Sequence, residues 1–298
     1  SFRKKEDRGG EASSLHQIAD ISYIRGDHSE AERLIRESLT LNREIGDKKG
    51  EAISLNFLGL ITQSQGDLTE AENLYLESWD IRIKIGDRRG EMSSIFNLGL
   101  NAKLRGDFVT AQRFYMESLA INREFSDNTL LANSMQHLGG LAERRGDLVE
   151  AQRMYRESLE LVREIGDKQG EAVSLLCLGT IAQIRGGLSH AEQFYRESLA
   201  ISREIGNREF ESSSLVNIGN IMRQKGDFKE AEKFIQNSLD INRDIGNRIA
   251  EANSLLNLAI LAQSRDDSIE QQHLSLEAIR IQREIGVPID QWFIDNGF

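Results

Sequence analysis

The feature that most constrains this fold is a repeat with a period of forty residues. Seven copies begin at Glu11, Glu51, Glu91, Leu131, Glu171, Glu211 and Glu251, and they align over residues 11–290 without an insertion or deletion. A period of this length arises when one small structural unit stacks on its neighbours many times. The chain of 298 residues is therefore predicted to be a solenoid of equal units instead of one globular core.

Each copy is predicted to contain two helices. In residues 51–90, apolar and small side chains follow helical spacing in two successive stretches, the first ending near Thr62 and the second running from Leu68 to Ile85. Gly66-Asp67 separates the stretches, because Gly can end one helix in the left-handed conformation and Asp can cap the next. No strand-like alternation persists, which excludes β-propeller blades of similar period.

Small residues recur at fixed positions of every copy. The position of Ser54 is Ser in all seven copies, and that of Gly59 is always Gly or Ala. The position of Ala71 is Ala in six copies, with Gln271 as the exception. Side chains of this size let two helix backbones approach closely, so we expect these positions to be helix contacts.

These residues carry a family resemblance. The pattern Leu55-x2-Leu58-Gly59-x2-Thr62, followed by Ala71-x3-Tyr75, resembles the tetratricopeptide signature W-x2-L-G-x2-Y and A-x3-F. Leu, Ile or Met stands where the family has Trp, and Arg or Ile replaces its closing Pro. Without that Pro the second helix continues for about two more turns, which explains the longer period. In this form the copies resemble those of Pins-type adaptors, kinesin light chains and bacterial peptide-sensing Rap proteins.

The resemblance implies an all-α fold, a right-handed superhelical solenoid of seven helix–turn–helix units. We place the units at residues 11–50, 51–90, 91–130, 131–170, 171–210, 211–250 and 251–290. Residues 1–10 are interpreted as a linker or the remnant of a preceding repeat, because Asp7-Arg8-Gly9-Gly10 aligns with Asp47-Lys48-Lys49-Gly50 between units.

The two ends of the regular pattern and one junction depart from it. Residues 287–298 are interpreted as a C-terminal capping segment, in which Pro288 stops the helix and Trp292, Phe293 and Phe298 can cover the last helix pair. The alternative is that this aromatic tail docks into another molecule. Before copy four, Ser126 replaces a Gly and Leu130-Leu131 enters a charged segment, which indicates local repacking or, alternatively, a contact patch or bend.

Composition restricts the classes of partner. The net charge of −11 argues against nucleic acid or an anionic membrane as the main partner. The sequence has no apolar stretch of membrane-spanning length and no signal peptide, which predicts a cytoplasmic location. Its single cysteine excludes an intrachain disulfide.

No constellation of catalytic or metal-binding residues is found in the sequence. The five histidines lie in different copies without carboxylate or cysteine partners at metal-ligand spacing. A phosphate-binding glycine loop and a nucleophile elbow are also missing. We therefore predict no enzymatic activity, no cofactor and no metal.

The resemblance also implies a binding surface, because the first helices of tetratricopeptide arrays line the concave side. The residues predicted to face this groove vary from copy to copy, unlike the packing positions. They are Ile53, Asn56, Phe57, Leu60, Phe96, Asn97, Leu100, Leu104, Leu176, Asn217, Asn220, Arg223, Asn257 and Ile260. The apolar members can bind a partner by burial, and the asparagines can bond to the backbone of an extended peptide. Alternatively, a tight superhelix buries part of this stripe between adjacent first helices.

The predicted function is a non-enzymatic protein–protein interaction scaffold that holds a peptide or protein segment in its groove. The chaperone-type carboxylate clamp of the family is not expected, since its lysines are missing from the matching positions. The alternative function is the sensor or regulatory arm of a larger signalling or defence protein. Self-association through terminal repeats or the aromatic tail is a further expectation.

Overall fold

The computed structural model describes residues 2–122 and 124–296, which form fifteen α-helices and no strand. The helices of the N-terminal half are α1 (Phe2–Ile24), α2 (His28–Ile45), α3 (Lys48–Ser64), α4 (Leu68–Ile85), α5 (Arg88–Leu104), α6 (Phe108–Asn122) and α7 (Asn128–Arg144). Those that follow are α8 (Leu148–Ile165), α9 (Lys168–Ile184), α10 (Leu188–Glu204), α11 (Arg208–Gln224), α12 (Phe228–Asp244), α13 (Arg248–Ser264), α14 (Ser268–Glu284) and α15 (Gln291–Asp295).

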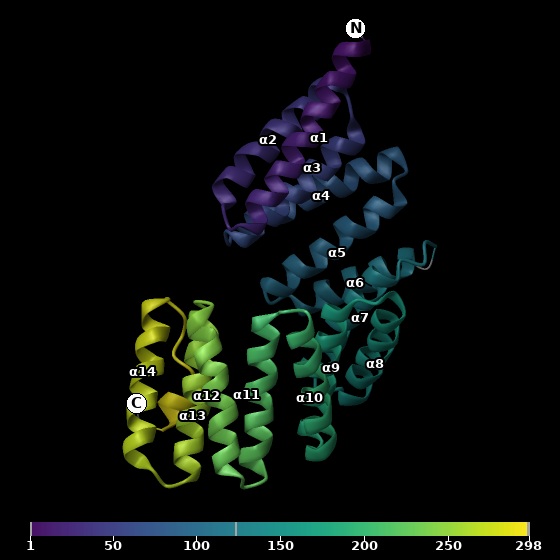
Figure 1. The fold of residues 1–298 in the computed structure, drawn as a ribbon. Helices are drawn as coiled ribbons and strands as arrows, with labels where there is room; N and C mark the ends of the chain where they lie inside the picture. Colours follow the sequence, from purple (N-terminus) through teal and green to yellow (C-terminus); the bar gives the residue numbers. More distant parts are fainter. Residues whose placement is uncertain (1, 123, 297–298) are drawn as a thin grey trace. The chain divides into compact units, whose positions relative to one another are not determined.

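The chain divides into two compact units, residues 1–141 and 142–298. Within each unit, consecutive helices pack against one another as hairpins, and each hairpin packs against the next (Figure 1). The odd-numbered helices α1 to α13 are the first helices of the predicted copies and the even-numbered helices α2 to α14 the second. The predicted all-α fold of helix–turn–helix units is confirmed.

The turns within and between copies use the predicted Gly-Asp pairs. Gly66 has φ 92°, a left-handed conformation that ends the first helix at low cost only for glycine. The Asp67 carboxylate then accepts a hydrogen bond of 3.0 Å from the Glu70 amide and caps α4. Gly86 (φ 71°) and Asp87 do the same between α4 and α5.

The first helices begin earlier than the predicted copies do. Asp47 caps α3 by accepting a 3.0 Å hydrogen bond from the Gly50 amide, so residues 48–50 are the first helical turn and not a linker. Likewise α1 starts at Phe2, so the expectation of a linker over residues 1–10 is wrong for residues 2–10, which continue directly into the first helix. The other interpretation of this segment, the remnant of a preceding repeat, stays a prediction.

The two helices of a copy meet where the sequence repeats its Gly or Ala. A methyl group added to Gly59 would lie 2.6 Å from Cε1 of Tyr75, and one added to Gly179 would lie 2.4 Å from the same atom of Tyr195. In copy seven the ring is replaced by Ser275, and the position of the Gly is occupied by Ala259. Ring and glycine therefore fit together, and this contact fixes the distance between paired helices.

Buried serines join most copies to the next one. The Ser78 hydroxyl donates to the carbonyl of Ala52 in its own copy (2.8 Å) and lies 3.0 Å from the Ser94 hydroxyl of the next copy. Ser158 and Ser174, Ser198 and Ser214, and Ser238 and Ser254 repeat this contact at 3.1–3.2 Å. A buried hydroxyl is costly without a partner, so these pairs fix the register between copies.

A buried glutamate near the start of most first helices adds an ionic contact between copies. Glu171 accepts from Arg163 Nε at 2.7 Å and from Lys168 Nζ at 3.2 Å. Burial acts to raise the pKa of Glu171, but the two hydrogen bonds together with the charges of the cations outweigh it and hold the pKa below its ordinary value. Glu51, Glu211 and Glu251 are paired in the same way. In copy four, Leu131 replaces this glutamate.

The junction before copy four is closed by different contacts. Ser126 takes the left-handed conformation (φ 54°) that glycine has elsewhere. The Asn122 side chain donates to the Asp127 carbonyl (2.8 Å) and accepts from the Asp127 amide (3.1 Å). Leu130 packs against the buried cluster that contains Tyr75 and Phe114, which is local repacking of the kind predicted.

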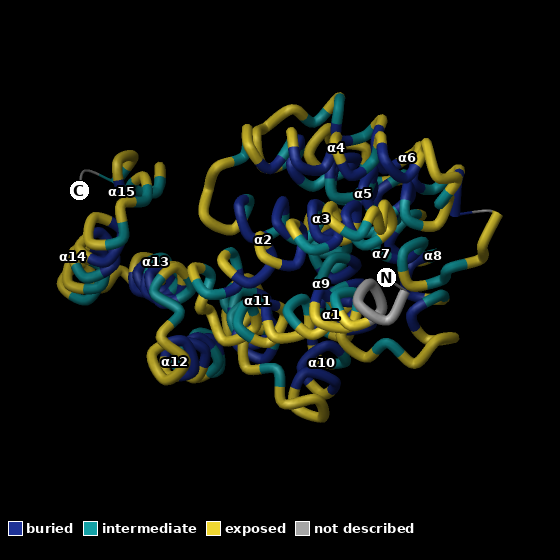
Figure 2. The backbone as a smooth tube through the Cα atoms, turned by 90° about the horizontal axis from the view of Figure 1, so that it is seen from above, coloured by how far each residue is buried: buried dark blue, intermediate teal, exposed yellow. Residues whose placement is uncertain are grey.

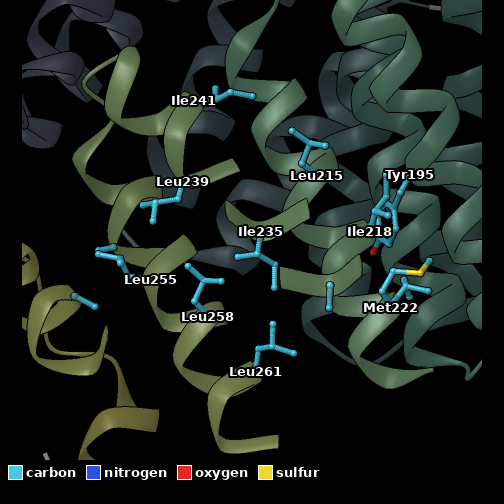
Figure 3. Close-up of a cluster of buried hydrophobic side chains, with 14 of the residues drawn as sticks. Tyr195, Leu215, Ile218, Met222, Ile235, Leu239, Ile241, Leu255, Leu258 and Leu261 are labelled. Atoms are coloured by element: carbon cyan, nitrogen blue, oxygen red, sulfur yellow. The ribbon is translucent and has the colours of Figure 1, made fainter. Parts of the chain in front are cut away.

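The apolar core of each unit runs between the helices. In the second unit one continuous cluster extends from Tyr195 through Ile218, Ile235 and Leu258 (Figure 3). Phe293 of α15 is fully buried in the same cluster, and Ile289 and Trp292 pack against it. Figure 2 shows that buried residues line the inner sides of the helices, whereas exposed residues lie mostly at turns and on outer sides.

The glycine–ring contact gives a stability prediction. Gly179→Ala inserts a methyl group into the space of the Tyr195 ring, and we expect it to lower the free energy of unfolding by about 1–3 kcal/mol. Gly10→Ala is the matched control, since nothing lies within 4 Å of the added methyl group and the site is helical. It should stabilise the protein by about 0.5–1 kcal/mol. If chemical denaturation gives the same change in the free energy of unfolding for Gly179→Ala and Gly10→Ala, the contact between Gly179 and Tyr195 is not tight.

The buried glutamate gives a prediction about pH. Because the pKa of Glu171 is lower in the folded than in the unfolded chain, its stabilisation is full above about pH 4.5 and is lost as the pH falls through the folded-state pKa. Thermal melts between pH 7 and pH 3 should therefore show a smaller acid-induced loss for Glu171→Gln than for the native protein. Glu160→Gln, at an exposed position of α8, should leave the pH profile unchanged.

Candidate partner-binding surface

Within each unit, neighbouring first helices lie side by side and share one face. Asn97 Nδ2 of α5 donates to Asn56 Oδ1 of α3 at 3.2 Å, and Asn220 Nδ2 of α11 donates to Asn257 Oδ1 of α13 at 2.8 Å. These bonds connect residues that the sequence assigned to a common surface. We call the half-exposed residues of the first helices on this face the first-helix strip, and describe it separately for each unit.

The predicted site residues are largely accessible along this strip. Ile53 is 39 % exposed and Leu104 is 54 % exposed, and the other twelve are half-buried. Leu58 and Leu98, which alternate with them on the same helices, are only 1 % exposed. The first-helix strip is therefore partly accessible to solvent and is not buried between adjacent first helices. Its role in binding stays a proposal.

In the first unit, the two predicted phenylalanines belong to aromatic clusters. The Phe57 ring lies 5.0 Å from the ring of His16 and 5.7 Å from that of Tyr23, both on α1. The Phe96 ring lies 5.6 Å from the ring of Tyr115 and 5.4 Å from that of His137. Each phenylalanine thus presents one side to the strip and packs its other side on aromatic neighbours.

The asparagines of the strip are partly occupied by one another. Asn56 accepts from Asn97, and Asn257 accepts from Asn220 and donates to the Asn253 carbonyl at 2.7 Å. Each amide group has two donor hydrogens and an acceptor oxygen, so Asn97 and Asn220 keep donor and acceptor capacity for a ligand backbone. The predicted amide contacts with a peptide thus remain available at these two positions.

A pocket beside Ile53 was missed by sequence reasoning. It has a volume of about 310 Å³ and lies between α1, α2 and α3, where His16, Asn42 and Ser54 are among the lining residues. His16 Nδ1 is buried without a hydrogen-bond partner among the described residues, and burial lowers the pKa of this histidine. A signal was present in the sequence, because copy one has Ser13 where copy two has the larger Ile53.

The first unit also contains a polar cluster that includes Lys103, which the sequence places on the groove-facing side of the first helix of copy three. Lys103 Nζ lies 3.4 Å from Nδ1 of His137. The His137 ring stacks on the ring of Tyr115, with centroids 5.0 Å apart and planes 8° from parallel. Burial, aided by the charge of Lys103, lowers the pKa of His137 to about 4, so its ring is neutral at pH 7.

The strip of the second unit is formed by α9, α11 and α13. Leu176 packs at the edge of the continuous core cluster, and Asn217, Asn220, Asn257 and Ile260 are half-buried beside it. The guanidinium Nε of Arg223 is buried without a partner among the described residues, and burial lowers the pKa of this group. An arginine keeps its charge at pH 7 despite such a shift, so this strip carries one half-buried cation.

The described part of the chain shows no group of three or more His, Cys, Asp or Glu side chains able to hold a metal ion. Among its helices, none is both long enough and apolar enough to cross a bilayer.

The repeat pattern matches two family models. The model described as "Tetratricopeptide repeat" matches residues 10–84, 50–124 and 91–164, and the model described as "MalT-like TPR region" matches residues 136–294. Together they account for nearly the whole repeat array. The chain belongs to the tetratricopeptide repeat family, as the sequence pattern predicted.

Solved structures with a similar fold include three proteins with low sequence identity. The apo form of RapI has a TM-score of 0.75 and 14 % identity, over 93 % of this chain and 99 % of RapI. The apo form of the quorum sensor NprR from B. thuringiensis has a TM-score of 0.75 and 13 % identity, over 90 % of this chain and 75 % of NprR. A search of curated protein sequences gives no match.

The third structure is a signal transduction ATPase with numerous domains from Pyrococcus horikoshii, which carries a tetratricopeptide repeat sensor. Its TM-score is 0.74 at 17 % identity, over 95 % of this chain but only 44 % of that protein. Identities this low show a shared fold alone.

The exposure of the strip gives a prediction about folding. The double variant Leu60→Glu with Leu100→Glu should keep the helical circular dichroism of the native protein, because both side chains are half-exposed and a glutamate there can reach water. Leu58→Glu with Leu98→Glu should unfold the first unit, because it buries two unpaired charges on the same helices. If both double variants unfold, the strip is part of the core.

Proposed function

We propose that the protein is an interaction scaffold that acts by binding and not by catalysis, and that a peptide or protein segment binds along the first-helix strip. The observation that carries this proposal is the contrast between two sets of positions on the same helices. In copies two to seven, Gly59, Ser54 and Leu58 and their equivalents are buried and nearly constant, whereas the half-exposed strip positions vary among the copies. Such a surface can recognise one sequence without changing the scaffold.

The strip of the first unit has the physical properties needed to hold a segment. Phe57, Leu60, Phe96 and Leu100 lie on the adjacent helices α3 and α5, where one amphipathic or extended segment can contact all four. Burial of apolar surface contributes about 25 cal/mol per Å², and the free donors and acceptors of Asn97 can orient the ligand backbone.

A second candidate function is the sensor or regulatory arm of a larger signalling or defence protein. The similarity to the Pyrococcus ATPase favours it, since this chain matches a portion of that protein, which carries a tetratricopeptide repeat sensor. A binding strip serves both functions, so the two candidates differ in what is attached to the array. The full open reading frame distinguishes them: a fused NTPase, protease or kinase domain supports the sensor arm.

Two further expectations accompany the scaffold proposal. A cytoplasmic location is one of them, and the acidic composition agrees with it. The other is self-association through the aromatic tail. Phe293 is fully buried and Phe298 lies outside the described residues, so Trp292, which is half-buried, is the ring of the tail to test. Analytical ultracentrifugation of the native protein and Trp292→Ala tests this expectation.

The binding proposal is tested by selecting peptides from a random twelve-residue display library on the purified protein. We expect selected peptides to lose most of their affinity for Leu60→Glu with Leu100→Glu, which places charge inside the apolar strip. Leu76→Glu with Met116→Glu is the matched control, because these apolar side chains are 40 % and 55 % exposed on the second helices of the same two copies. Affinity measured by fluorescence anisotropy should be nearly unchanged in the control.

Two outcomes would contradict the proposal. If no peptide is enriched above background, the strip does not hold peptide segments. If peptides bind the native protein and both double variants equally well, the binding surface lies elsewhere, on the second helices, near Leu130 or on the aromatic tail.

A further inference from the structure

A buried tyrosine of the first unit lacks a partner that three equivalent tyrosines have. The hydroxyl groups of Tyr75, Tyr155 and Tyr195 donate to the side-chain oxygens of Gln63, Glu143 and Gln183 at 3.0–3.1 Å. In each case the acceptor lies twelve residues before the tyrosine, on the first helix of the same copy. Tyr115 is also fully buried, but its hydroxyl has no hydrogen-bond partner among the described residues.

The missing partner is explained by one residue. Position 103, twelve residues before Tyr115, is a lysine, and a protonated amine can donate hydrogen bonds but cannot accept one. Its nitrogen lies near His137 instead. Burial raises the pKa of Tyr115, so its hydroxyl stays a donor at neutral pH. A buried donor without an acceptor is destabilising, and copy three carries this cost where copies two, four and five do not.

The cluster of Lys103, Tyr115 and His137 presents hydrogen-bond donors without a matching acceptor. The Lys103 amine donates to Nδ1 of His137, so in the neutral ring the proton lies on Nε2. No described carboxylate lies within ion-pair distance of Lys103. By contrast, Lys48, Lys168 and Lys225 each pair with a glutamate. Lys103 is thus a half-buried cation in an acidic protein, one helical turn from Leu100 of the strip.

We propose that Lys103 and Tyr115 form a subsite of the first-helix strip that binds the carboxylate of an aspartate or glutamate side chain of the bound segment. The carboxylate supplies the acceptor that the tyrosine lacks and the negative charge that the lysine lacks. The lysine side chain is flexible, so it can move from His137 to the ligand and open the way to the Tyr115 hydroxyl. Phe96, which contacts both Tyr115 and His137, places this polar subsite beside the apolar part of the strip. The inference rests on the proposed function, because it assigns a ligand chemistry to the same strip.

The structural premise is tested by thermal melts of the protein without ligand. Lys103→Gln restores the residue type that serves Tyr75 and Tyr195, so it should raise the melting temperature. Tyr115→Phe should also raise the melting temperature, because it removes a buried hydroxyl that has no partner among the described residues, whereas Tyr75→Phe should lower it by breaking the bond to Gln63. Equal losses for Tyr75→Phe and Tyr115→Phe would overturn the premise.

The ligand assignment is tested by repeating the random twelve-residue peptide selection on the native protein and on Lys103→Gln. We expect peptides selected on the native protein to share one Asp or Glu at a fixed distance from their apolar residues, and peptides selected on Lys103→Gln to lack it. Replacing that Glu by Gln should raise the dissociation constant about tenfold or more on the native protein and less than about twofold on Lys103→Gln.

Each other outcome has a definite meaning. If amidation of the peptide C-terminus weakens binding and the Glu→Gln change does not, the carboxylate is terminal and the assignment to a side chain is wrong. If strip-binding peptides are selected without a shared acidic residue, this inference fails while the scaffold function stands. If no peptide is enriched at all, the scaffold function fails as well.

Discussion

The contact between a small residue on each first helix and a bulky side chain on the second helix determines much of this structure. Gly59, Gly99 and Gly179 each leave only enough space for a tyrosine ring, and the rings hold the two helices of a copy at a fixed distance. The hydroxyl groups of Tyr75, Tyr155 and Tyr195 reach the side chain twelve residues earlier on the first helix, whereas that of Tyr115 has no partner among the described residues. Core packing and surface chemistry are therefore coupled through one residue in these copies. The residue twelve positions before the tyrosine therefore decides whether the buried tyrosine hydroxyl has a hydrogen-bond partner.

Contacts between copies are of a different physical kind. Buried serine pairs and buried glutamates hold neighbouring hairpins in register through hydrogen bonds, and these groups are satisfied only when the next copy is correctly placed. The junction before copy four replaces the glutamate with Leu131 and the Gly with Ser126, and it relies on Asn122 and on the packing of Leu130. Apolar and side-chain-to-backbone contacts thus take the place of the buried glutamate there, beside the ion pair of Arg89 with Asp127.

Because these packing contacts occupy a constant set of positions, the strip positions are free to differ between copies. In the first unit the result is an apolar surface of Phe57, Leu60, Phe96 and Leu100 that ends at the cation of Lys103. In the second unit it is a more polar surface with paired asparagines and Arg223. An apolar surface gives affinity in proportion to the area covered, whereas a half-buried cation or a buried donor selects for a particular partner group. The arrangement is consistent with the proposed binding of one segment.

The sequence by itself determined the family, the helix pairs and the Gly-Asp turns, because these depend on local spacing and on conformations that a few residue types prefer. It also identified strip residues such as Phe57, Leu60 and Leu100, since helical periodicity separates the buried from the half-buried side of a helix. It did not reveal that residues 48–50 belong to a helix, because a charged, glycine-containing segment resembles a linker until Asp47 is seen to cap it. The contact of Lys103 with His137, the pocket beside His16 and the pairing of Asn56 with Asn97 were decided by tertiary structure alone. Their significance depends on distances between side chains on different helices, which a periodic pattern does not encode.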